Sequence, residues 1–114
     1  MSDTIFSKII KREIPAEILY EDDDVLAFRD VSPQAPVHFL VIPKLEIPTI
    51  NDLQPDQAEL IGKMVLAAKQ VAAKQGVAEG GYRLVMNCNE DGGQTVFHIH
   101  MHVLGGRAMS WPPG

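Results

Sequence analysis

The fold of this chain is decided by the stretch VFHIHMHVL, residues 96–104. Apolar residues and histidines alternate along it, which is typical of a β-strand with one face in the core. The core face would carry Phe97, Ile99, Met101 and Val103. His98, His100 and His102 would then stand in a row on the other face, with Cα atoms about 6.5–7 Å apart.

Such a row has several interpretations. It could be the polar face of a half-buried strand, or His98 and His102 could be buried hydrogen-bond donors. Two of the rings could bind zinc with a third ligand from elsewhere, but three rings on a nearly straight strand diverge too far to reach one ion at roughly 2 Å. The row could also support nucleophilic catalysis, with His100 attacking through one nitrogen while the other keeps a proton.

The residues just before the row favour an anionic ligand. Backbone N–H groups in the turn Gly92-Gly93-Gln94-Thr95 could form a nest for a phosphate, and Thr95 adds a hydroxyl donor. No Lys-Ser/Thr pair follows the glycines, so this is not a Walker loop. A simple hairpin turn is the alternative interpretation.

The rest of the chain predicts an α+β fold with an antiparallel five-stranded sheet. We expect a short helix over residues 5–10, capped by residues 2–4, and a long helix over 55–75. Strands are expected at 18–21, 25–30, 37–42, 82–87 and 96–104, with a turn-rich loop at 90–94. The long helix would be followed by Gly76 as its C′ residue, and its apolar stripe would contain Ile61, Met64, Val65, Ala68, Val71 and Ala72.

Size and charge narrow the function classes. The 114 residues suit one domain, residues 1–114, with a Pro-rich tail over 107–114. The net charge of −5 argues against a nucleic acid or an anionic membrane as the main partner. The single cysteine, Cys88, excludes an internal disulfide and suits a reducing compartment such as the cytoplasm. The polar N-terminus predicts no signal peptide.

Residues 98–104, HIHMHVL, match the complete signature of the histidine triad superfamily. The chain further resembles the nucleotide-binding branch of that superfamily, whose members hydrolyse adenosine phosphoramidates and related nucleoside phosphoramidates. The resembling stretches are residues 3–6, 29–36, 38–44, 91–94 and 104–107. The likeness extends from about Asp3 to Gly114.

This resemblance implies a covalent mechanism that needs no metal or other cofactor. His100 would attack the α-phosphorus of a purine nucleotide and form a nucleotidyl-histidine, from which water releases the nucleoside monophosphate. His98 and His102 would contact phosphate and leaving-group atoms, and His38 would order the other histidines.

The resemblance also implies a binding site around the nucleotide. The phosphate would be lined by Asn87, Gly93, Gln94 and Thr95, and Asp30 would hold the ribose hydroxyls. The base would lie in an apolar slot made of Ile5, Phe6, Ile9, Ile14, Phe28, Val31 and Leu40. Asp30 could instead simply open a turn, and the helix residues could be ordinary core.

Finally, the resemblance implies a homodimer whose sheet continues across the interface. Trp111 in the C-terminal tail would then reach the partner subunit's active site, and a mobile terminus is the alternative. Three other functions stay open on the sequence: a nucleotide-binding regulator or scaffold, a dinucleoside polyphosphate hydrolase, and a zinc protein.

Overall fold

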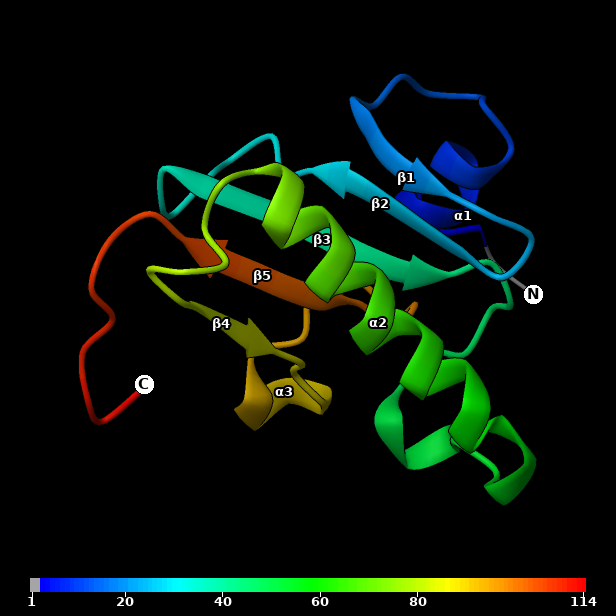
Figure 1. The fold of residues 1–114 in the computed structure, drawn as a ribbon. Coiled ribbons are helices and arrows are strands. Elements are labelled where there is room, and N and C mark those ends of the chain that lie inside the picture. The colour runs from blue at the N-terminus through cyan, green and yellow to red at the C-terminus, as the bar shows by residue number, and fades with distance from the viewer. Residues whose placement is uncertain (1–2) are drawn as a thin grey trace.

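The computed structural model describes residues 3–114 and contains one five-stranded sheet (Figure 1). The strand order is β1-β2-β3-β5-β4, and all neighbouring strands are antiparallel. The strands are β1 (Ile18–Glu21), β2 (Val25–Arg29), β3 (Val37–Pro43), β4 (Tyr82–Val85) and β5 (Met101–Gly105). The helices are α1 (Ile5–Ile10), α2 (Ala58–Lys74) and α3 (Asn89–Gly92), with 3₁₀ turns at Ile50–Asp52 and Pro55–Gln57. The predicted α+β class and five-stranded sheet are confirmed.

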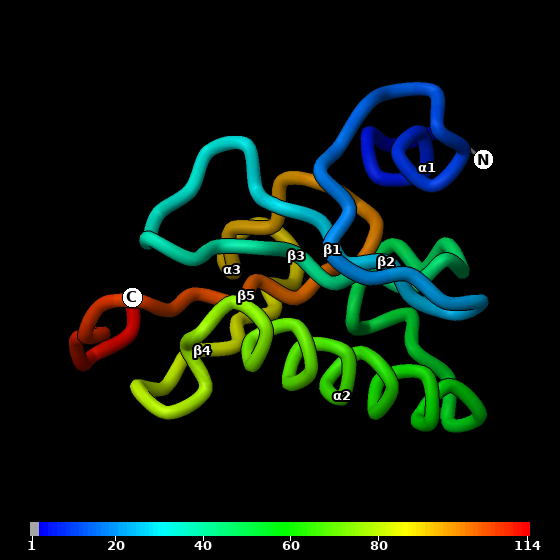
Figure 2. Tube along the Cα trace, turned by 45° about the horizontal axis from the view of Figure 1, so that its top comes forward, coloured from blue at the N-terminus to red at the C-terminus, as the bar shows by residue number. Residues whose placement is uncertain are grey.

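The two faces of the sheet carry different helices, and Figure 2 shows α1 and α2 on opposite sides. Successive side chains of a strand point to opposite faces. On β2, Val25 and Ala27 therefore pack in the cluster that includes α2, whereas Leu26 and Phe28 pack in the cluster that includes α1. This alternation leaves one sheet face for the main core and the other for a smaller apolar cluster beside the histidines.

The long helix α2 forms nearly as predicted, with Pro55 opening a 3₁₀ turn before it. Gly76 has a φ of +80°, and Val77 N–H donates to the Ala72 carbonyl, which is the pattern of a Schellman C-cap. The predicted stripe is wrong at Val65, which is 41% exposed. No helix within residues 3–114 is long and apolar enough to cross a membrane.

The short helix α1 is capped by Thr4, whose side chain accepts a hydrogen bond from Ser7 N–H. The reciprocal bond, from Thr4 N–H to the Ser7 hydroxyl, completes a capping box. Ser2, also expected to contribute to the cap, lies outside the described residues. The cap fixes the start of a helix whose Phe6 and Ile9 are buried.

The histidine strand is shorter than predicted, because β5 begins at Met101 rather than Val96. In the register of β3 and β5, Val41 opposes Met101, so Pro43 would oppose Ile99. Proline has no N–H to add to a ladder. Ile99 N–H instead donates to the Ile47 carbonyl, 2.8 Å away. Phe97, expected in the core, is 48% exposed as a result.

Other boundaries also differ from the prediction: β2 ends at Arg29 rather than Asp30, and β3 extends to Pro43 instead of ending at Ile42. The fourth strand ends at Val85 rather than Asn87. The expected loop at 90–94 overlaps a one-turn helix, α3, which is capped at its C-terminus by Gly93 with a φ of +83°. The left-handed conformation suits glycine, since it has no Cβ.

Candidate active site

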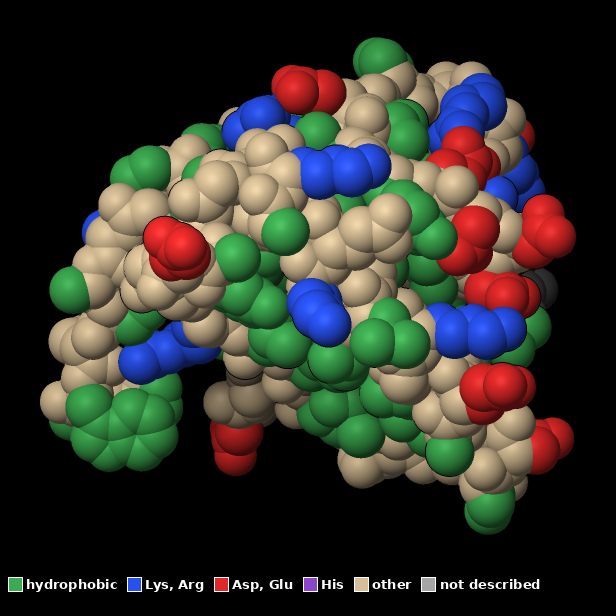
Figure 3. Space-filling view, in the orientation of Figure 1, with side chains coloured by type: hydrophobic (Ala, Val, Ile, Leu, Met, Phe, Trp, Pro, Cys, Tyr) green, Lys and Arg blue, Asp and Glu red, His purple; other side chains and the backbone are tan. Residues whose placement is uncertain are grey.

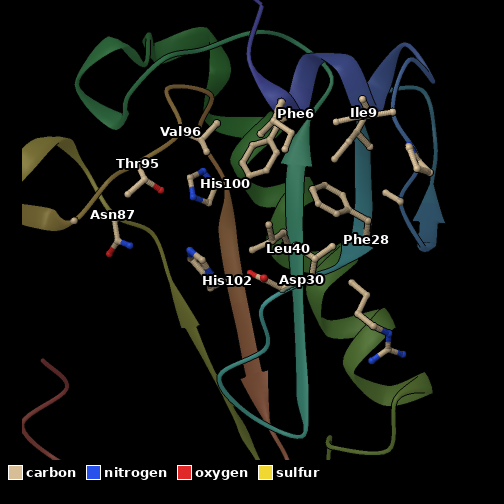
Figure 4. Close-up of a pocket in the computed structure, with 17 residues that line it drawn as sticks. Phe6, Ile9, Phe28, Asp30, Leu40, Asn87, Thr95, Val96, His100 and His102 are labelled. Carbon is tan, nitrogen blue, oxygen red and sulfur yellow. The ribbon is translucent and has the colours of Figure 1, made fainter.

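A cavity of about 410 Å³ lies beside α1 and the histidine segment (Figure 4). Its volume falls within the range of small-molecule sites. The face covered by α2 shows no histidine among its coloured side chains (Figure 3), which agrees with a site on the opposite side of the sheet. The cavity is lined by Ile5, Phe6, Ile9, Ile14, Pro15, Ala16, Phe28, Arg29, Asp30, Val31, Leu40, Asn87, Gly93, Thr95, Val96, His100 and His102.

His100 is oriented by a hydrogen bond to its own segment. Its Nδ1 lies 2.8 Å from the His98 carbonyl oxygen. A carbonyl can only accept, so Nδ1 carries the proton and Nε2 keeps a lone pair. Burial lowers the pKa of His100 and so favours the neutral ring. The ring therefore offers a neutral imidazole nitrogen, with no partner among residues 3–114, at the wall of the cavity.

His102 has the opposite tautomer, set by a chain of hydrogen bonds. Gln34 N–H donates to His38 Nδ1 at 3.0 Å, so the neutral His38 ring carries its proton on Nε2. That nitrogen lies 3.0 Å from His102 Nδ1 and 3.3 Å from Asp30 Oδ2. His102 Nδ1 therefore accepts, and its Nε2–H is left as a donor.

Burial favours the neutral form of the His38, His100 and His102 rings at physiological pH. Burial, followed by the neighbouring His100 and His38, lowers the pKa of His102 to about 4. Burial also lowers the pKa of His38, against the opposing charge of Asp30. Two adjacent neutral imidazoles thus present a lone pair and an N–H donor to one cavity.

The same cluster is close enough to hold a metal ion, since the ligand atoms of Asp30, His38 and His102 lie within 4.8 Å of one another. Zinc needs a lone pair on each ligating nitrogen. The Gln34 N–H already occupies Nδ1 of His38 and so places the proton of the neutral ring on Nε2, the atom that faces the cluster. Metal binding would require breaking that bond, and this chemistry favours the hydrogen-bonded arrangement over a zinc site.

The structure places His98 away from the cavity. Its ring is 1% exposed, and its Nε2 donates to the Pro43 carbonyl at 2.7 Å. The expectation that all three histidine rings share one face is therefore wrong, because the backbone leaves strand geometry before residue 101. His98 acts on the site through its carbonyl oxygen, which holds His100.

The glycine-rich turn is used differently from the predicted nest. The N–H groups of Gly93 and Gln94 donate to the carbonyls of Glu90 and Asn89 and so close α3. The Gln94 side chain is buried and bonds to Asn89 N–H and to the carbonyls of Pro48 and Val96, so it braces the loop instead of lining the cavity.

Most of the residues expected around the phosphate and the ribose line the cavity, although Gln94 does not. Thr95, Asn87, Gly93 and Asp30 all line it. Asp30 also opens a turn, since its Oδ1 accepts from Ser32 N–H at 2.8 Å. Asp30 therefore opens the turn, and its carboxylate, which has about four acceptor positions, also lies at the cavity.

The apolar end of the cavity contains every residue expected there: Ile5, Phe6, Ile9, Ile14, Phe28, Val31 and Leu40. Val31 lies at the open edge and is 95% exposed. The sequence reasoning missed Pro15, Ala16, Arg29 and Val96. Pro15, Arg29 and Val96 each adjoin a predicted site residue, and this adjacency is the one signal that could have found them. Nothing in the local sequence marks Ala16 as a cavity residue.

Comparison to known families agrees with the histidine motif, two of whose rings line the cavity. The HIT domain family model matches residues 11–109. This chain belongs to the HIT domain family. The HIT chain is 57% identical over 107 residues to the purine nucleoside phosphoramidase of Escherichia coli (strain K12), covering 94% of this chain and 90% of that protein. The family resemblance of the histidine motif is thereby confirmed.

Solved structures of HIT proteins share the fold. The HIT family hydrolase from Legionella pneumophila Philadelphia 1 is 54% identical, with a TM-score of 0.96 over 98% of this chain and 100% of that one. A histidine triad protein from Clostridium difficile is 38% identical, with a TM-score of 0.92 over 96% of each chain. These likenesses support the whole architecture and not only the motif.

Proposed function

We propose that this HIT protein hydrolyses purine nucleoside phosphoramidates and releases the nucleoside monophosphate. The observation that carries the proposal is the neutral His100 ring, held with its Nε2 lone pair at a cavity of nucleotide-compatible size. The 57% identity to a purine nucleoside phosphoramidase supports the same reaction.

In the first step, His100 Nε2 attacks the α-phosphorus as the bond from phosphorus to the amine nitrogen breaks. The amine keeps the electron pair of that bond and takes a proton from water at the cavity mouth. The Nε2–H of His102 and the hydroxyl of Thr95 stabilise the developing charge on the phosphoryl oxygens, which is the main requirement of phosphoryl transfer. His38 is the positioning residue that fixes the His102 tautomer.

In the second step, a water attacks the phosphorus and gives its proton to the hydroxide left by the first step, while the bond to His100 Nε2 breaks and its electron pair returns to the ring. The nucleoside monophosphate leaves and the neutral ring is restored. No metal or other cofactor takes part in this scheme. The apolar slot formed by α1 and Phe28 would enclose the base, and Asp30 would accept from the ribose hydroxyls.

A turnover assay separates this proposal from its alternatives. We expect the purified protein to release the monophosphate from adenosine and guanosine 5′-phosphoramidates far faster than it cleaves diadenosine polyphosphates. The opposite preference would indicate a dinucleoside polyphosphate hydrolase. Tight nucleotide binding without turnover would indicate a regulator or scaffold, and turnover lost to a chelator would indicate a metalloenzyme.

We also propose that the protein is a homodimer. Strand β4 is an edge of the sheet, and an unpaired edge is a template for another strand. Leu66 on α2 is 63% exposed and lines a surface hollow together with Tyr82 of β4, and Leu84 on β4 is 37% exposed, so apolar side chains flank that edge. Apolar side chains also gather between α2 and the lower edge of the sheet in Figure 3. Trp111 is 81% exposed and has the Arg83 guanidinium over its ring, so most of the ring is open to a partner.

Sedimentation velocity of single variants tests the dimer. Leu66→Lys places one charge from each subunit in the proposed interface. We therefore expect a dimer dissociation constant at least about 10-fold higher than that of the wild type. Leu45→Lys is the matched control, since Leu45 is 53% exposed but lies outside α2 and β4. A monomeric wild type, or equal effects of both substitutions, would refute the interface.

We place the protein in a reducing compartment, the cytoplasm. Cys88 is a free, half-buried thiol. A single thiol cannot form an internal disulfide and persists where thiols stay reduced. Fractionation of the source cells followed by immunoblotting checks this placement.

A further inference from the structure

Phe6 of α1 packs directly against the His100 ring. The ring centroids are 4.9 Å apart and the planes cross at 76°, an edge-to-face contact. Phe6 is 6% exposed and makes a second edge contact with Phe28 at 5.6 Å. Figure 4 shows the Phe6 ring beside the His100 ring, at the wall of the cavity.

Phe6 restrains the orientation of the His100 ring from a distant part of the chain. The other two restraints are the bond from Nδ1–H to the His98 carbonyl and the His102 ring 5.1 Å away, and both come from the histidine segment itself. Phe6 reaches the same imidazole from a helix at the other end of the sequence. The orientation of His100 therefore depends on α1 being docked.

Apolar packing and an ion pair hold α1 against the sheet. Phe6 and Ile9 belong to the apolar cluster with Leu26, Phe28 and Leu40. Arg12, just after the helix, forms an ion pair with Glu21 of β1. Phe6 also lines the cavity, so a ligand bound in the apolar slot would contact the same residue that contacts His100.

We propose that Phe6 is a positioning residue that holds the His100 imidazole in its attacking orientation, keeps water from it, and so couples filling of the apolar slot to alignment of the nucleophile. The inference rests on the proposed function for its kinetic consequence. The contact itself is independent of that function.

Water exclusion by Phe6 has a measurable electrostatic consequence. Burial is the largest cause of the lowered pKa of His100. The titratable groups around the ring are Asp30 after β2, His98 in its own segment and His102 on β5, whereas Lys8, the one titratable residue of α1, is exposed. Replacing Phe6 by a smaller residue admits water without removing a charge, so the pKa of His100 should rise.

Kinetics test the positioning role with a matched control on the same helix. We expect Phe6→Ala to lower kcat by roughly 10- to 100-fold, since small misplacement of a reacting group has effects of that size. The acid limb of the pH profile should move to higher pH. Ile9→Ala removes a buried side chain from the same wall, farther from His100 in Figure 4. It should chiefly raise KM, by about 10-fold.

An NMR titration of the His100 ring tests the contact without any substrate. The midpoint of the His100 titration should rise most in Phe6→Ala. It should rise less in Phe6→Leu, which keeps an apolar side chain, and least in Ile9→Ala. If Phe6→Ala does not fold, a higher His100 midpoint in Phe6→Leu than in Ile9→Ala would still support the inference. Equal midpoints in the Phe6 and Ile9 variants would overturn the inference. Absence of phosphoramidate turnover in the wild type would refute the proposed function alone.

Discussion

His100→Ala is expected to reduce turnover of a nucleoside phosphoramidate by roughly 10⁴- to 10⁶-fold, as loss of a nucleophile does in other covalent hydrolases. The cause is specific: Nε2 of this ring is the neutral lone pair that the hydrogen bond from Nδ1–H to His98 leaves at the cavity. The neighbouring His102 cannot replace it, because its Nε2 carries a proton in the tautomer set by His38. Steady-state kinetics at neutral pH measure the loss.

Binding provides the control for that variant. The apolar slot residues and Asp30 all remain when the His100 ring is removed, so calorimetry should show nucleoside monophosphate binding within about 10-fold of the wild type. Circular dichroism should show an unchanged fold. Normal turnover by His100→Ala would exclude the covalent scheme.

Acid should destabilise the fold well above the range in which carboxylates titrate. The His102 pKa is about 4 in the folded chain against an ordinary 6.5, so the unfolded chain binds more protons as the pH falls between these values. The contribution of neutral His102 to the free energy of unfolding is therefore fully present above pH 6.5 and is lost as the pH falls toward 4. At pH 5, His102 alone has lowered the free energy of unfolding by about 2 kcal/mol. Burial lowers the pKa of His38, His98 and His100 too, which gives losses of the same sign.

Urea unfolding at pH 7 and pH 5, at one protein concentration, measures this decline. Glu21 and Asp22 have lowered pKa values, so their contributions are lost mostly below pH 5 and do not confuse the window. In His102→Gln, the free energies of unfolding at pH 7 and pH 5 should differ by about 2 kcal/mol less than in the wild type. An equal difference in wild type and variant would show that His102 is not held neutral by the fold.

Much of the fold could be predicted because its strands follow simple periodicity. On β3, Phe39 and Val41 face the α2 side while Leu40 and Ile42 face the α1 side, as an alternating pattern requires. The end of α2 was equally predictable, since Gly76 is suited to the left-handed conformation that it adopts. These features depend on neighbours in sequence.

The site was harder to predict where it depends on distant contacts. The burial of His98 follows from the Pro43 carbonyl, 55 residues earlier, and from the Ile47 carbonyl that takes Ile99 N–H. The bracing role of Gln94 likewise needs the position of Pro48. Local alternation therefore predicted a straight row of three rings, whereas tertiary hydrogen bonds turn one of them inward.

Mass spectrometry of the enzyme quenched during turnover of adenosine 5′-phosphoramidate would detect the nucleotidyl-His100 intermediate itself. We predict one added nucleotidyl group per chain, on the peptide that contains residues 96–107 and localised by fragmentation to His100. His100→Ala should carry none. A wild-type enzyme that turns over at full rate with no adduct at any quench time, or with the adduct on His102, would contradict the account.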